Sequence, residues 1–147
     1  MGRIVHFTDH TANNSDKTLD LSQYTNGGVK SSGEIELKYG IIALTTTATA
    51  GNRLMTIQVK DENGNEVFHT HPGSYQAASL TYHYYLMPGI YRETVSAVAE
   101  ATVDGTIQMP FPEDFEWPTG WSIRIYDKNA IDAAADDMLI DLALEVC

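Results

Sequence analysis

Hydrophobic and polar residues alternate with a period of two over most of the chain from residue 34 onward. This period places every second side chain on the same face of an extended strand, so such a segment is typical of a half-buried strand. The first example, residues 34–44, has apolar residues on one face and charged residues on the other: Ile35, Leu37, Tyr39 and Ile41 against Glu34, Glu36 and Lys38. We expect the apolar set to face a core.

Later segments repeat this alternation, at residues 54–61, 79–86, 106–111, 120–127 and 137–146. Their apolar faces predict the rest of the core: Met55, Ile57, Val59, Leu80, Tyr82, Tyr84, Leu86, Ile107, Met109, Phe111, Trp121, Ile123, Ile125, Met138, Ile140, Leu142, Leu144 and Val146. Asn63-Gly64 follows the segment at residues 54–61, and these residue types best tolerate the positive φ of a tight turn. Residues 53–70 are therefore predicted to form a hairpin.

Helical patterns are scarce in this sequence. Residues 94–103 are rich in alanine but also in β-branched residues, which leaves helix and strand both open, and residues 129–137 are expected to form one or two short turns. No strand–helix–strand alternation occurs, which argues against a parallel α/β sheet. About eight short strands separated by turn signals predict an all-β fold, an antiparallel β-sandwich that is jelly-roll-like.

The N-terminal segment has a different pattern. Residues 1–18 are polar apart from a short apolar stretch that contains Ile4, Val5 and Phe7. We predict an extended N-terminal arm over residues 1–18, with a short strand at RIVHF and a loose connection after it, followed by a sandwich domain over residues 19–147. Such a strand could pair with an open sheet edge of a neighbouring chain. Residues 25–33, with three glycines, are predicted to form a flexible loop.

Charge and composition exclude several partners. The chain has 147 residues, which suits one domain with a sizeable core, and its formal net charge is −11. Affinity for nucleic acid depends on Lys and Arg that replace counterions, so we expect no binding to nucleic acid or to an anionic membrane. No apolar run could span a bilayer, and the N-terminus turns polar too early for a secretory signal, so we expect no export by that route. Cys147 is the only cysteine, which excludes an internal disulfide.

His69 and His71 form the clearest candidate metal site. Their spacing places both imidazoles on one side of a strand, and cupins, a metal-binding group of jelly-roll proteins, use such a pair. The cupin pattern then needs a glutamate a few residues later, where this chain has PGSYQ, and a third ligand would have to come from His6, His10 or His83. A catalytic zinc site needs at least three protein ligands. We therefore interpret the pair as two exposed imidazoles at the end of a strand and predict no bound metal.

No other motif predicts catalysis. Asp61, Asn63 and Asn65 are spaced like the start of an EF-hand loop, but Pro72 occupies the position of the closing glutamate, which favours a simple hairpin turn. Nucleotide-binding loops, serine-hydrolase elbows and zinc-protease motifs are absent, and no spacing singles out a catalytic triad. The acidic pair Asp136-Asp137 is interpreted as part of a solvated loop. We expect no catalytic residue, no cofactor and no enzymatic activity.

Aromatic residues between positions 110 and 121 allow a function of another class. Phe115, Trp117 and Trp121 lie near several acidic residues and could stack on a sugar, as the aromatic platforms of carbohydrate-binding modules do. In the other interpretation, Trp121 begins a core strand and the prolines stiffen a crossing at the surface. A carbohydrate-binding β-sandwich module is therefore kept as an alternative.

The tyrosines give the most positive functional signal. Four of the eight lie within residues 82–91, and alternation places Tyr85 with His83 on the face opposite the core. Aromatic residues on an outer face with few charges between them are typical of a contact surface. The candidate contact residues of the chain are Ile4, Val5, Phe7, His83, Tyr85, Tyr91 and Trp117.

Residues 51–147 resemble a set of small all-β proteins encoded among the structural genes of tailed bacteriophages. The resemblance runs through the segments GNRLMTIQVKDENGNEVF, QAASLTYHYYLMPG, DGTIQMPFP, PTGWSIRIYD and NAIDAAADDMLIDLALEV. It implies a structural virion protein, made in the cytoplasm of a bacterial host. The resemblance includes no active-site residue.

Within that group, the resemblance implies a capsid decoration (cement) protein. Such a protein binds the major capsid protein on the outside of the capsid and stabilises the head. Decoration proteins commonly associate as trimers or dimers, so a homo-oligomer is also implied. A component of the tail or of the head–tail connection is the alternative virion role.

Overall fold

The described part of the chain is built from strands, turns and loops. A computed structural model describes residues 3–21, 25–26, 29–30, 34–73, 75–89, 104–113, 115–118 and 120–146. The strands are β1 (Arg3–Asp9), β2 (Asp16–Asp20), β3 (Thr25–Asn26), β4 (Val29–Lys30), β5 (Glu34–Thr45), β6 (Met55–Lys60), β7 (Glu66–Thr70), β8 (Thr81–Leu86), β9 (Asp104–Met109), β10 (Glu116–Pro118), β11 (Ser122–Asp127) and β12 (Asp137–Val146). None of the described segments is a helix long and apolar enough to cross a membrane.

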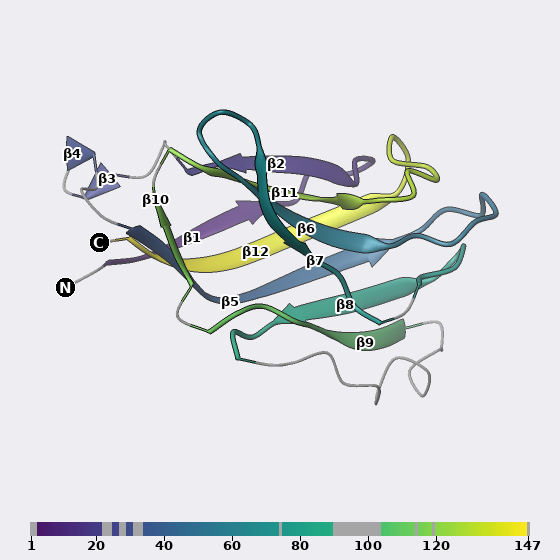
Figure 1. The fold of residues 1–147 in the computed structure, drawn as a ribbon. Helices are drawn as coiled ribbons and strands as arrows, with labels where there is room; N and C mark the ends of the chain where they lie inside the picture. The colour runs from purple at the N-terminus through teal and green to yellow at the C-terminus, as the bar shows by residue number, and fades with distance from the viewer. Residues whose placement is uncertain are drawn as a thin grey trace.

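The main strands form two sheets that lie one over the other (Figure 1). Sheet A has the order β1-β12-β5-β8-β9, with β10 also paired to β5, and sheet B has the order β2-β11-β6-β7. Four antiparallel pairs are nested in the sequence, so that each pair encloses the next one. They are β1–β12, β2–β11, β5–β8 and β6–β7. Nested pairing divided over two sheets is the jelly-roll arrangement, so the predicted jelly-roll-like sandwich is confirmed.

The core lies between the two sheets and consists of the side chains that the alternation selects. All predicted inward residues of β6, β8, β9, β11 and β12 are buried, and so is Phe111. Leu80 and Trp121 directly precede their strands and pack half-buried against this core. Tyr84 is one of two tyrosines among the inward residues, and its hydroxyl donates a hydrogen bond to Oε1 of Gln76 at 2.7 Å. Burial raises the pKa of Tyr84, so the phenol stays protonated as a donor.

Residues 3–18 do not form a separate arm in this structure. β1 pairs with β12 along its full length, from Arg3 opposite Val146 to Asp9 opposite Ile140. Val5 and Phe7 pack against the core. β2 is an edge strand of sheet B, paired with β11, so the boundary predicted at residue 18 falls inside a strand. The expected strand at RIVHF is present, but it belongs to the sandwich of its own chain.

Lys17 holds the connection between β1 and β2 close to the sheets. Its buried Nζ donates to Oδ1 of Asp9 at 2.9 Å and to the carbonyl oxygens of Thr11 and Met138 at 3.0 and 2.6 Å. An ammonium group that is removed from water needs such acceptors. The prediction of a loose connection after RIVHF is therefore wrong, because a polar sequence does not reveal that its lysine is buried.

A β-bulge interrupts β5. Leu37 lies opposite Leu144 of β12 and Tyr39 lies opposite Ala143, so Lys38 is an extra residue in β5. An extra residue shifts the alternation of the strand by one position. Everything that follows Lys38 in β5 therefore changes face relative to an uninterrupted strand.

The bulge corrects the predicted face of two residues. Ile35 and Leu37, before the bulge, are buried as expected. Ile42 and Leu44, after it, are also buried, although they are even-numbered. Tyr39 and Ile41 are exposed instead, so the prediction that they share the face of Ile35 and Leu37 is wrong.

A buried ion pair joins the loop after β5 to the loop before β12. Nε and Nη2 of Arg53 donate to the two carboxylate oxygens of Asp136 at 2.9 and 3.2 Å, and Nη1 donates to the carbonyl oxygens of Thr49 and Gly51. Both charged side chains are fully buried. The interpretation of Asp136 as a solvated residue is wrong, because its partner lies 83 positions away in the sequence.

Most of the predicted turns are present in the structure. Gly64 has a φ of 81° in the β6–β7 hairpin, and Oδ1 of Asp61 accepts hydrogen bonds from the amides of Asn63 and Asn65 at 2.9 Å. Short turns occur within residues 128–136, as expected. In the segment predicted as a flexible loop, β3 and β4 pair antiparallel. Residues 94–103 lie outside the described residues.

Candidate docking face

Exposed apolar side chains gather on the outer face of sheet A, the side turned away from sheet B. We call these residues the apolar face: Ile4, Tyr39, Ile41, Met87 and Leu139. Each has an exposed fraction between 37% and 50%. Among the residues that the structure describes, the other exposed large apolar side chains are Val67 and Tyr75, neither of which lies in sheet A. We treat this set as the candidate contact surface of the chain.

Strand alternation and the bulge place these side chains. Leu139 lies between two buried core residues of β12, and Met87 follows the buried end of β8. In the register of sheet A, Ile41 lies opposite Asp141 on one side and Tyr85 on the other. Tyr39 reaches toward β1, where its ring meets the ring of His6 edge to face at a centroid distance of 6.4 Å. The face therefore runs across β1, β12, β5 and β8.

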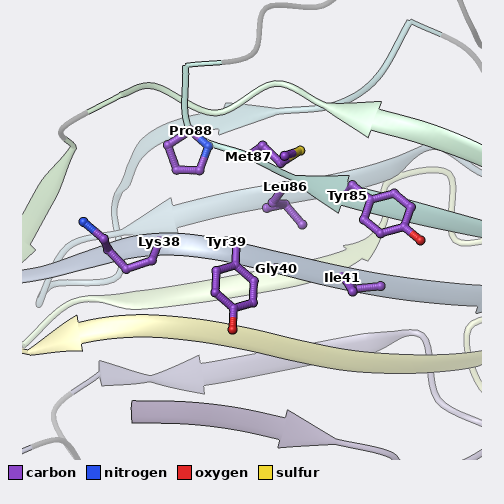
Figure 2. Close-up of a pocket in the computed structure, with 8 residues that line it drawn as sticks. All are labelled: Lys38, Tyr39, Gly40, Ile41, Tyr85, Leu86, Met87 and Pro88. Atoms are coloured by element: carbon purple, nitrogen blue, oxygen red, sulfur yellow. The ribbon is translucent and has the colours of Figure 1, made fainter. Parts of the chain in front are cut away.

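A hollow of about 480 Å³ lies on this side of the molecule, where β5 and β8 run together. Its lining comes from residues 38–41 and 85–88, and Figure 2 shows the rings of Tyr39 and Tyr85 on either side of Ile41. Gly40 is a lining residue with no room for a side chain. A Cβ at this position would lie 2.5 Å from Cδ2 of Leu142, so a larger residue would displace a core side chain.

The charged groups on this side of sheet A are paired within the chain. Nζ of Lys38 lies 2.8 Å from Oε1 of Glu36 and 3.4 Å from Oε1 of Glu145. The hydrogen bond with Glu36 raises the pKa of Lys38. Nε2 of His10 lies 3.2 Å from both carboxylate oxygens of Asp141. Because these charges have partners within the chain, the apolar surface of a binding partner could cover the face without burying an unpaired charge at Lys38 or Asp141.

The structure places the predicted contact residues in several settings. Ile4 belongs to the apolar face, whereas Val5 and Phe7 are half-buried and turned toward the core. His83 and Tyr85 lie half-buried on the outer face of β8, where alternation placed them. Tyr91 and the side chain of Trp117 lie outside the described residues. Sequence reasoning missed Tyr39, Ile41, Met87 and Leu139.

One signal in the sequence could have found part of the missed set. Ile41 and Ile42 are adjacent apolar residues, and they follow Gly40 in a segment that otherwise alternates. Two apolar neighbours in a strand must point to opposite faces, so one of them lies on the outer side unless both faces are covered. Leu139 follows Met138 and precedes Ile140 in the same way.

The histidine pair does not assemble into a metal site here. The rings of His69 and His71 stack at a centroid distance of 6.2 Å. Nδ1 of His69 lies 3.2 Å from Oε2 of Glu66, and Nδ1 of His71 donates to the carbonyl oxygen of Pro72 at 2.9 Å. Within the part of the chain that the structure describes, no three His, Cys, Asp or Glu side chains are grouped to hold a metal ion.

Two of the three aromatic residues considered for sugar binding, Phe115 and Trp121, pack against other side chains, and the side chain of Trp117 lies outside the described part of the chain. Phe115 lies against Phe68 and Phe111, at centroid distances of 4.9 and 6.0 Å. Trp121 packs half-buried against the core, and its indole nitrogen donates to Oε2 of Glu62 at 2.8 Å. These two rings therefore do not form an open stacking platform.

The fold and this surface define a jelly-roll β-sandwich with exposed apolar side chains on the outer face of sheet A. No protein-family model matches the chain, and no curated protein matches it.

Chains in solved structures of infectious bursal disease virus are similar to this one. The Gx strain structure covers 98% of this chain at 15% identity with a TM-score of 0.33. The T13 viral particle covers 99% at 15% identity with a TM-score of 0.35, and the VP2 subviral particle covers 98% at 17% identity with a TM-score of 0.32. This chain spans about a third of those chains, 31% to 33% of their length. The jelly-roll assignment rests on the strand pairing described above rather than on likenesses at these TM-scores.

Proposed function

We propose that this chain is a structural protein of a virus particle, specifically a capsid decoration (cement) protein. It binds the major capsid protein on the outside of the shell and stabilises the head, after synthesis in the cytoplasm of a bacterial host. The role is not enzymatic. The observation that carries this proposal is the concentration of exposed apolar side chains on the outer face of one sheet of a jelly roll.

The fold narrows the classes of function. Jelly rolls occur in viral capsid proteins, lectins and cupins, and a fold alone does not decide among them. A cupin needs convergent metal ligands, and a sugar-binding module needs an open aromatic platform. The side chains of His69, His71, Phe115 and Trp121 are engaged in other contacts. A surface for binding protein is the remaining class with a matching feature.

The apolar face has the character of a protein-contact surface. It combines tyrosine, methionine and aliphatic side chains, and aromatic residues and methionine are enriched in interfaces. The face is partly buried already, so covering the exposed remainder of its five side chains would contribute on the order of a few kcal/mol to binding. A contribution of this size suits a protein that is present on a particle in many copies, each held by a contact of modest affinity.

The resemblance to structural proteins of tailed bacteriophages supports a virion role over other protein-binding roles. It covers residues 51–147, which include Met87 and Leu139 of the apolar face. Ile4, Tyr39 and Ile41 lie outside that range, on β1 and β5 of the same sheet. A component of the tail or of the head–tail connection would use the same face on another part of the particle.

Quantitative mass spectrometry of gradient-purified particles from the source culture tests the virion role. A decoration protein should be present at a fixed and high ratio to the major capsid protein. A low copy number of roughly one ring of subunits per particle would favour the tail or connection role. Absence of the chain from the particles would overturn the proposal.

Paired variants test the docking face. Tyr39→Ser with Ile41→Ser removes two apolar side chains from the face, and we expect co-sedimentation with particles that lack the protein to weaken at least about tenfold, or roughly 1.4 kcal/mol. Val67→Ser with Tyr75→Ser is the matched control, because it removes comparable exposed side chains outside sheet A. Equal binding by the two double variants would exclude the apolar face as the contact.

A further inference from the structure

Two tyrosines border the hollow between β5 and β8. Tyr39 and Tyr85 lie on either side of Ile41, and both line the hollow (Figure 2). Neither hydroxyl has a hydrogen-bond partner among the residues that the structure describes. A phenol that becomes covered by a bound protein needs such a partner, because an unpaired polar group is costly to bury. The occupant of the hollow must therefore supply hydrogen-bond acceptors.

The rest of the lining favours an apolar, uncharged occupant. Apart from the tyrosines, the lining is apolar except for Lys38, whose ammonium group is paired with Glu36 and Glu145. A charged side chain placed in the hollow would lose its water without finding an unpaired opposite charge. The acceptors that the tyrosines need must therefore be neutral, as backbone carbonyl groups are.

The strands under the hollow cannot bind a partner by strand addition. β5 pairs with β12 and β8, and β8 pairs with β5 and β9, so neither strand has an open edge. The backbone of the occupant must instead lie across the outer face, with its carbonyl oxygens near the tyrosines. Strands and helices use these carbonyls in their own hydrogen bonds, whereas a polyproline II segment leaves them unpaired.

We propose that the hollow binds an uncharged, proline-rich segment of the partner protein, in the polyproline II conformation with prolines three residues apart. Grooves lined by aromatic residues bind such segments in other proteins, where the fixed φ of proline lowers the entropy that is lost on binding. The inference names the chemistry of the partner segment, so it rests on the docking face proposed above.

The spacing of the two tyrosines agrees with this repeat. Tyr85 lies opposite Ile41, so Tyr39 is its diagonal neighbour on β5. Diagonal neighbours of paired strands lie roughly 7–8 Å apart. A polyproline II helix rises about 3.1 Å per residue with three residues per turn, so prolines three residues apart lie about 9 Å apart along one edge. One proline ring can therefore pack against each tyrosine.

The segment belongs to a different protein rather than to a second copy of this chain. The chain has five prolines, and no two of them are three residues apart: Pro72, Pro88, Pro110, Pro112 and Pro118. The required repeat is therefore absent from its own sequence.

A synthetic peptide tests this site without any particle. The isotope-labelled chain is titrated with a capped, uncharged nine-residue peptide that has proline at every third position, and backbone amide signals are followed by NMR. We expect a saturable shift at residues 39–41 and 85–87, with a Kd on the order of 1 mM or tighter. The same peptide with alanine in place of proline should bind at least about fivefold more weakly. No saturable shift up to about 5 mM, or equal binding of the alanine peptide, would overturn the proposal.

Phenylalanine variants test the role of the hydroxyls. Tyr39→Phe with Tyr85→Phe removes both hydroxyls and keeps both rings, so we expect peptide binding to weaken at least about fivefold through two lost hydrogen bonds. Tyr75→Phe is the matched control, because Tyr75 is an exposed tyrosine outside sheet A, and it should bind the peptide as wild type does. A double variant that binds as tightly as wild type would contradict the assignment.

The peptide experiment and the particle experiments can fail separately. Particle binding through the apolar face without peptide binding would overturn the proline-rich segment and leave the docking face in place. Peptide binding by a chain that is absent from particles would support the proline site and remove the virion role.

Discussion

Asp136 is a charged residue that is buried in an ion pair with Arg53. Its carboxylate is fully buried, and its two oxygens accept hydrogen bonds from Arg53 and from the amide of Thr47. Removing one member of a buried ion pair leaves the other charge without compensation, which lowers the free energy of unfolding by about 3–5 kcal/mol. We expect Asp136→Asn to lower the free energy of unfolding by about that amount, measured by urea denaturation.

A double substitution separates the charge from the packing. Arg53→Met with Asp136→Leu removes both charges and keeps apolar volume, so it should recover much of the stability lost by the single variant. Asp141→Asn serves as the exposed control on the following strand and should change stability by less than about 0.5 kcal/mol. A single variant as stable as wild type would mean that Arg53 finds other acceptors.

These residues show what a local pattern cannot reveal. The segment DAAADD predicts turns correctly, because turn formation depends on neighbours in the sequence. Whether Asp136 is solvated depends on Arg53, and no local feature connects the two positions. The same limit applies to Lys17, whose acceptor on Met138 lies 121 positions away. The faces of the regular strands were predictable from alternation, and buried charges were not.

At the scale of single elements, β1 is the strand whose role the structure changes most. It supplies Val5 and Phe7 to the core and Asp9 to buried Lys17. A truncation that removes residues 1–15 keeps β2 but exposes the edge of β12. Lys17 would lose its acceptor atoms on Asp9 and Thr11, and the core would lose Val5 and Phe7. We therefore expect the melting temperature to fall by more than about 10 °C, or the transition to lose cooperativity.

An exposed substitution in the same strand is the control for this truncation. Ile4→Ser changes the outer side of β1 and should leave the melting temperature within about 2–4 °C of wild type. Circular dichroism melting of both variants is sufficient. A truncated chain that melts like wild type would show that β1 contributes little to its own sandwich and would restore the idea of an independent arm.

The bulge in β5 makes a second prediction at the scale of an element. Deleting Lys38 would remove the extra residue and leave Leu37 and Tyr39 opposite Leu144 and Ala143, as they already are. Inward and outward faces would be kept, so we expect a soluble, cooperatively folding protein that loses at most about 2 kcal/mol.

Deleting Ile41 is the matched control, because that position lies in regular pairing. Its removal would shift one part of the strand to the opposite face and place Ile42 outward or Tyr39 inward. We expect that variant to be insoluble or to lack a cooperative transition. Comparable folding of the two deletions would mean that β5 can slip its register, which would weaken the account of why Tyr39 and Ile41 are exposed.

The bulge also explains why the candidate site was only half predictable. Alternation identified His83 and Tyr85 as outer-face residues, because β8 is regular over its six residues. In β5 the pattern before residue 38 was extended to Tyr39 and Ile41, and one extra residue reverses it. A bulge leaves no firm mark in a single sequence, so part of the face could be found only from the pairing of β5 with β12.

At the scale of the whole molecule, the class of the fold is more predictable than the number of strands or the order in which they pair: about eight strands were expected, and the structure describes twelve. Turn signals and alternation indicated an all-β sandwich, and that class is confirmed. The jelly roll, however, is defined by long-range pairs such as β1 with β12, which lie at opposite ends of the chain. Local sequence patterns set the faces of strands and leave the choice of partner to the packing of the complete core.

The net charge of the molecule leads to the last prediction. A chain with a formal charge of −11 is surrounded by a negative potential, whereas the proposed docking face is apolar and its charges are paired internally. Added salt screens long-range charge without removing apolar contacts. We expect binding to particles to stay constant or to strengthen as salt is raised from about 50 to 500 mM, within the screening range of exposed charges.

Co-sedimentation over this salt series measures the effect, with the Tyr39→Ser and Ile41→Ser double variant beside wild type. If apolar contact carries docking, the ratio between the two proteins should hold at every salt concentration, because the substitution changes no charge. A contact made mainly by ion pairs would instead weaken steadily with salt, as binding that replaces counterions does. A wild-type affinity that falls tenfold or more between about 50 and 200 mM salt would therefore contradict the apolar docking face and direct attention to the carboxylates at the rim of sheet A.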